Sequence, residues 1–173
     1  MDLDALLSSR LIGGRHAAYI VDKDLLHHPR TRRAWRAILI LIAAESVVGV
    51  AALVYAFLNR DNPELVTPMV WFRGIVVLAM TLTLLAFAAV GMRGYYWAYS
   101  RLRLFSQIFP IVTLIIAAIP SLYPLWMVIE QIVFSVLMIG ISDYLRSDHM
   151  RDVFPRPPKQ PATDPIRTAG DST

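Results

Sequence analysis

"RAILILIAAESVVGVAALVYAF", residues 36–57, is an apolar run that one glutamate, Glu45, interrupts. An α-helix rises about 1.5 Å per residue, so a run of this length can cross a hydrocarbon core of about 30 Å. Three more segments resemble it, and the four predicted spans are residues 37–58, 69–92, 104–121 and 123–144. The sequence therefore predicts an all-α integral membrane protein, a bundle of four transmembrane helices.

The composition agrees with a chain that has lipid as its solvent. Hydrophobic residues make up 56% and charged residues 17%, which is more apolar and less charged than an ordinary soluble domain. Cysteine is absent, so this chain offers no disulfide, thiolate metal ligand or iron–sulfur cluster. The first apolar run exceeds the roughly 7–15 residues of a cleavable signal core, so we expect no cleaved signal peptide. Arginine far outnumbers lysine, which favours a GC-rich bacterial source.

The basic residues predict an orientation. Of the 17 Lys and Arg residues, only Arg60 and Arg73 fall in or beside the connections expected outside, and the other 15 precede span one, lie between spans two and three, or follow span four. The positive-inside rule then places both termini in the cytoplasm of a cell inner (plasma) membrane. Anionic lipid headgroups at the cytoplasmic face are expected partners, since each nearby basic residue attracts them by about 1 kcal/mol.

Outside residues 37–144 the chain divides into two cytoplasmic segments. In residues 1–36, Leu3, Leu6, Leu7 and Leu11 share one helical face, which predicts an interfacial amphipathic helix. Residues 145–173 are rich in proline and polar side chains and are predicted to be a largely disordered tail. The tryptophans are predicted to anchor the two membrane interfaces, Trp35 and Trp97 at the inner one, Trp71 and Trp126 at the outer one.

Motifs for known chemistry are absent from the sequence. No histidine lies within a span, and no glycine-rich phosphate loop, G-x-S-x-G turn or H-E-x-x-H helix occurs. Asp148 and Asp152 lie one turn apart beside His149, but adjacent helical residues point in different directions, so this spacing does not favour a metal. We predict no catalytic residue, cofactor, metal or nucleic-acid partner, and an enzyme is the least favoured hypothesis.

The first span carries a face of small side chains behind its carboxyl group. The spacing i, i+4, i+7, i+11 aligns Glu45, Gly49, Ala52 and Ala56, and such a face lets another helix approach closely. Glu45 lies about 12 Å inside the cytoplasmic boundary, where no basic residue shares its depth. We therefore expect a protonated carboxyl that bonds to a neutral partner, Gln107 or Ser46.

The other polar residues within the spans are Arg73, Gln107, Glu130 and Gln131. Residue counts place Arg73 about 6 Å and Glu130 about 10 Å below the outer surface, so we predict an ion pair between spans two and four, with snorkelling of Arg73 as the alternative. Gln131 shares a polar stripe on span four with Ser135 and Ser142. Gln107 lies near Pro110, which cannot donate to the carbonyl of Ser106.

Two functions fit these residues. The first is a non-catalytic accessory or scaffolding subunit that binds a membrane-protein partner, or a second copy, through the small-residue and carboxylate face. The second is a small proton-coupled transporter in which Glu45 or Glu130 exchanges protons. The first is favoured, because no internal repeat or pair of broken helices points to a transport site.

Overall fold

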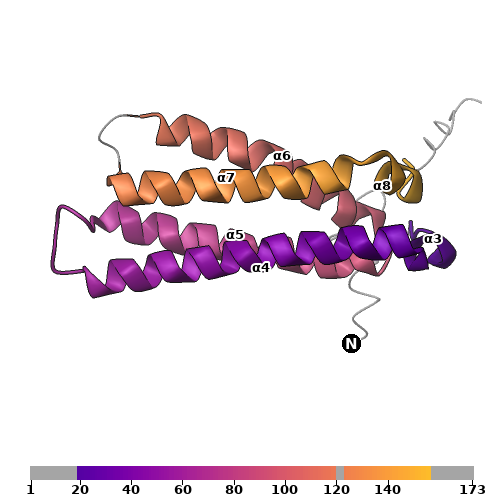
Figure 1. Cartoon of the computed structure of the whole chain (residues 1–173), viewed down its shortest axis with the longest axis horizontal. Helices are drawn as coiled ribbons and strands as arrows, with labels where there is room; N and C mark the ends of the chain where they lie inside the picture. Colours follow the sequence, from indigo (N-terminus) through magenta and orange to yellow (C-terminus); the bar gives the residue numbers. More distant parts are fainter. Residues whose placement is uncertain (1–18, 120–122, 157–173) are drawn as a thin grey trace, which may run out of the picture.

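The computed structural model describes residues 19–119 and 123–156. Four of its helices are long and apolar enough to cross a membrane: α4 (Pro29–Leu58), α5 (Pro68–Met92), α6 (Tyr96–Ala117) and α7 (Leu125–Arg146). Short helices α3 (Lys23–His27) and α8 (Asp148–Val153) lie together at one end of the bundle (Figure 1). The all-α class and the four candidate spans are confirmed. The orientation stays a prediction, and the proposed helix at residues 2–12 and the tail from 157 lie outside the described residues.

The four long helices form a closed ring of antiparallel neighbours. Contacts join α4 to α5, α5 to α6, α6 to α7, and α7 back to α4. Their inward faces share an apolar core that includes Ile42, Leu84, Leu102 and Met138. Outward-facing side chains are also largely apolar, as a bundle in lipid requires. The polar residues within the spans can therefore be sorted by whether they face this core.

Two helices begin well before the predicted spans. α4 starts at Pro29, where the imidazole Nδ1 of the N-cap residue His28 accepts a hydrogen bond from the backbone N–H of Arg30 (3.2 Å). α6 starts at Tyr96, directly after Gly94, whose φ of +93° allows the tight turn from α5. Hydropathy located the apolar part of these two helices and missed the arginine-containing turns that precede it.

The segment after α7 differs from the predicted disordered tail. Ser147 turns the chain, and α8 packs back against α4 and α7. Met150, Val153 and Phe154 are all buried. Residues 148–154 therefore belong to the folded bundle, because their apolar side chains complete the core at this end.

Trp35 and Trp97 were expected to anchor the lipid interface, and the structure buries them inside the bundle end instead, with exposed fractions of 3% and 5%. Gly91 makes room for the first indole, because a Cβ on Gly91 would lie only 2.7 Å from Cη2 of Trp35. Trp71 and Trp126 are half-buried, and the Trp126 indole N–H donates to the carbonyl of Leu65 (3.1 Å). Trp35 and Trp97 thus serve packing in place of anchoring.

Candidate functional site

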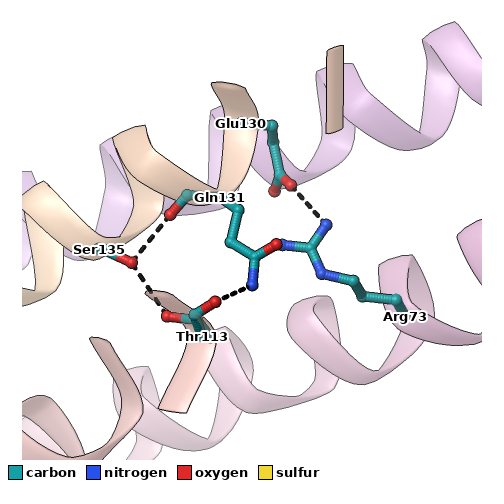
Figure 2. Close-up of polar contacts among 5 residues, drawn as sticks. All are labelled: Arg73, Thr113, Glu130, Gln131 and Ser135. Atoms are coloured by element: carbon teal, nitrogen blue, oxygen red, sulfur yellow. Dashed lines mark hydrogen bonds and ion pairs between the residues drawn. The ribbon is translucent and has the colours of Figure 1, made fainter. Parts of the chain in front are cut away.

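An ion pair joins α5 to α7 inside the bundle. Nη1 of Arg73 lies 2.9 Å from Oε2 of Glu130, and the two side chains are 9% and 11% exposed (Figure 2). The guanidinium carbon also lies 5.4 Å from the ring centroid of Tyr123. The predicted pairing is confirmed, although Nη2 of Arg73 is buried without a hydrogen-bond partner among the described residues. Each charge is compensated by a partner from another helix, which is what a buried charge requires.

A second polar cluster lies beside the ion pair and joins α6 to α7. The side-chain amide of Gln131 donates to the backbone carbonyl of Thr113, and the hydroxyls of Thr113 and Ser135 are 2.9 Å apart. The Ser135 hydroxyl also donates to the backbone carbonyl of Gln131 (2.9 Å). Figure 2 shows the Gln131 carboxamide between the ion pair and Thr113. The sequence predicted a polar stripe with Gln131 and Ser135 but did not identify Thr113. The one feature that could have identified it is a polar side chain within an apolar span, three residues after Pro110.

Glu45 is a buried carboxyl group that lacks any such partner. Its side chain is 1% exposed, and neither carboxylate oxygen has a hydrogen-bond partner among the described residues. The expected donors do not reach it, because the Ser46 hydroxyl donates to the carbonyl of Ile42 on its own helix (2.9 Å) and Gln107 is half-buried on α6. The prediction of a hydrogen-bonded Glu45 is therefore wrong for this structure.

The register of the helices shows what surrounds Glu45. Trp35 meets Gly91 and Leu53 meets Gly74, so interpolation between these contacts places Glu45 at the level of Thr81 on α5. The Thr81 hydroxyl donates to the carbonyl of Val77 (3.0 Å) and is satisfied on its own helix. The hydroxyl proton of Thr81 is therefore already used at this level and makes no bond to Glu45.

The small-residue face of α4 lies against the chain's own helices. Gly49 and Ala56 are buried and Ala52 is half-buried, and all three line a crevice of about 10 Å³ between α4, α5 and α7. Arg73 and Glu130 line the same crevice. A space of this size holds about one water molecule. The helix that approaches this face is α5, so the face is occupied within the chain.

A third polar contact fastens α8 to the start of α4. The Thr31 hydroxyl is fully buried and donates to the carbonyl of Leu25 (2.9 Å). A hydroxyl has one proton, so His149, whose Nε2 lies 2.9 Å from the same oxygen, must be the donor in their hydrogen bond. The rings of His28 and His149 lie 5.2 Å apart. No pattern in the sequence predicts this contact.

Metal-binding groups do not converge in the part of the chain that the structure describes. No set of three or more His, Asp and Glu side chains lies close enough there to hold an ion. His149 is directed towards Thr31, and Asp148 lies 3.9 Å from Arg151. The candidate site is the set of polar groups inside the bundle: the ion pair with its neighbouring amide and hydroxyl cluster, and Glu45, which lies about two helical turns from them.

Comparisons with known proteins add no relative: no family model matches the chain, and no curated protein or solved structure matches it.

Proposed function

We propose that this chain is a non-catalytic membrane protein, an accessory or scaffolding subunit that binds another membrane component. One observation carries the proposal: polar side chains of α5, α6 and α7 contact one another between helices and join these helices inside the bundle. The crevice beside them, at about 10 Å³, is far smaller than a ligand pocket of roughly 300–1,000 Å³. A closed bundle of this kind is suited to presenting a fixed outer surface to a neighbour.

The surface we assign to the partner differs from the one that the sequence favoured. The face of Glu45, Gly49 and Ala56 is covered by α5 and α7, so it is not open to a second protein in this arrangement. A partner would meet the outward apolar faces of the long helices. Association there would rest on close packing, since lipid tails are as apolar as these side chains.

Copurification tests the accessory function. A tagged full-length chain, extracted in a mild detergent from membranes of its own source, should bring down one other membrane protein in fixed ratio. The untagged strain is the control for non-specific recovery. Recovery of the tagged chain alone, or only with copies of itself, would contradict the proposal.

A proton-coupled transporter is the second candidate, and the unpartnered carboxyl of Glu45 is the observation that favours it. An ionisable group in the membrane interior that no contact explains is a functional hypothesis by default. Glu130 is the weaker candidate for this role, because Arg73 already compensates it.

Two substitutions at Glu45 separate the candidates. If the residue has no transport role, both Glu45→Gln and Glu45→Leu should leave complementation intact, since neither removes a hydrogen bond that the structure contains. If it carries protons, both should abolish coupled flux in proteoliposomes, because neither side chain can release a proton. Ser46→Ala is the matched control, since among the described residues its hydroxyl bonds only to its own helix. Full flux through Glu45→Gln would remove the transport role from this residue.

A further inference from the structure

A wide hollow lies at the end of the bundle that carries α8. Its volume is about 620 Å³, and it lies between the first turns of α6, α8 and the residues that follow α8. Its charged lining consists of Arg103, Arg151, Arg156, Asp148 and Asp152. None of the polar residues of the candidate site inside the bundle lines this hollow.

The framework of the hollow is firmly held. The ring of Tyr99 stacks on Phe154 with centroids 4.3 Å apart, and its hydroxyl donates to the carbonyl of Leu145 (2.6 Å). The buried side chain of Met150 fixes the opposite side of α8 against the core. The exposed side of α8, with Asp148, Arg151 and Asp152, is therefore presented to the hollow on a supported element.

The depth of the hollow matches the lipid headgroups. Arg103 comes directly before the apolar part of α6, which begins at Leu104, while α8 lies beyond the end of α7. Arginine side chains at such a boundary extend to the headgroup layer. A molecule bound among these side chains would thus sit where the polar end of a phospholipid lies.

The lining has both signs of charge. Three guanidinium groups supply forked donors that suit phosphate oxygens. Two carboxylates accept hydrogen bonds, and only one of them, Asp148, has an ion pair among the described residues, a loose one of 3.9 Å to Arg151 with both side chains largely exposed. The lining therefore fits a headgroup that combines a phosphate with a cation able to donate hydrogen bonds.

We propose that this hollow binds the headgroup of a phospholipid that carries a phosphodiester and a primary ammonium group, as in phosphatidylethanolamine. Arg103, Arg151 and Arg156 contact the phosphate, and Asp148 and Asp152 accept from the ammonium. A purely anionic headgroup such as phosphatidylglycerol leaves both carboxylates facing negative charge. A choline headgroup has a cation but no N–H to donate. The proposal is independent of the function proposed for the bundle.

Lipid retention by the purified full-length chain tests the assignment. The delipidated protein in detergent is mixed with phosphatidylethanolamine, phosphatidylglycerol or phosphatidylcholine of identical acyl chains, and bound lipid is counted by native mass spectrometry. We expect phosphatidylethanolamine to be retained about tenfold more tightly than either competitor, the scale set by one charge-assisted contact. Inorganic phosphate and glycerophosphoethanolamine, which lack acyl chains, should compete weakly.

Variants locate the site. Arg103→Gln should lower retention of all three lipids, whereas Asp152→Asn should remove the preference for phosphatidylethanolamine over phosphatidylglycerol. Arg32→Gln, an exposed arginine of α4 outside the hollow, is the matched control and should change neither. Asp152 is exposed, so its variant remains informative if Arg103→Gln fails to fold.

Three results would overturn the assignment. Equal or tighter retention of phosphatidylglycerol by the unmodified chain would show that the hollow does not prefer a headgroup with an ammonium group. An absence of discrimination among the lipids would remove the site altogether. Full competition by inorganic phosphate would replace the lipid with a small anion.

Discussion

The Arg73–Glu130 ion pair makes the sharpest stability prediction. The two charged groups are 2.9 Å apart and their side chains are 9% and 11% exposed, so removal of one partner leaves a nearly buried charge uncompensated. Arg73→Met or Glu130→Gln alone should each lower the free energy of unfolding by about 3–5 kcal/mol. The double variant leaves neither charge behind, so its loss should be well below the sum of the two single losses.

The size of the coupling follows from the same geometry. Two unit charges about 4 Å apart attract by about 4 kcal/mol at an effective dielectric constant near 20. Hydrogen bonds between membrane helices contribute about 0.6–2 kcal/mol, because the unfolded helices also find partners in the bilayer. We therefore expect a coupling free energy of about 2–4 kcal/mol from the double-mutant cycle.

The assay is unfolding of the full-length chain in mixed micelles by increasing mole fractions of SDS, followed by tryptophan fluorescence. Arg60 and Asp61 provide a control cycle, since this pair is 4.0 Å apart with side chains 57% and 95% exposed. Its coupling should be about 0–1 kcal/mol, as for other exposed pairs. Additive losses in the Arg73–Glu130 cycle would refute the reasoning, because a contact at 2.9 Å must couple the two residues.

Three further predictions concern orientation, packing and the α8 contact. Because the chain has no cysteine, a single cysteine at position 62 (Asn62→Cys) should react with an impermeant thiol reagent in intact cells, while one at position 100 (Ser100→Cys) should not; the reverse pattern would invert the predicted orientation. In SDS unfolding, Gly91→Ala should destabilise the bundle by about 1–3 kcal/mol, because the new Cβ would meet the rigid indole of Trp35. Gly49→Ala should stabilise it by about 0.5–1 kcal/mol, because nothing lies within 4 Å of the new Cβ. Equal effects of the two substitutions would contradict the packing. Thr31→Val should increase hydrogen exchange in α8, since it removes the acceptor of the imidazole N–H, and unchanged exchange would show that this contact does not hold the helix.

The parts of the structure that the sequence could predict are those that depend on depth alone. Counting residues along apolar runs gave the four spans within a few residues at most boundaries. The same counting placed Arg73 and Glu130 at similar depths, and the ion pair followed because both happen to face the core. Depth is set by a helical rise of about 1.5 Å per residue and needs no knowledge of packing.

The spacing of Glu45, Gly49 and Ala56 predicted the packed face of α4, but the sequence did not determine which side chains of α6 meet the other helices. Gln107 was expected to reach Glu45 from a suitable depth, but it is half-buried on α6 and makes no bond to that carboxyl. Thr113 faces Ser135 for reasons of packing that hydropathy does not report. The contact between Thr31 and His149 joins residues 118 positions apart. The six residues of α8 contain no apolar run long enough to predict that this helix packs against the bundle.

The two carboxyl groups of the interior make opposite contributions to the stability of the bundle. Glu130 is compensated by Arg73, so its loss removes a contact and leaves a charge behind. Glu45 makes no hydrogen bond among the described residues, and a buried polar group left unpaired costs about 1–3 kcal/mol. A leucine at position 45 should therefore stabilise the bundle, while a leucine at position 130 should weaken it. A residue that lowers the stability of the bundle is not explained by folding. A more stable Glu45→Leu variant that fails in complementation would therefore point to a functional carboxyl and favour transport. A more stable variant with full activity would leave the accessory function as the account of this bundle.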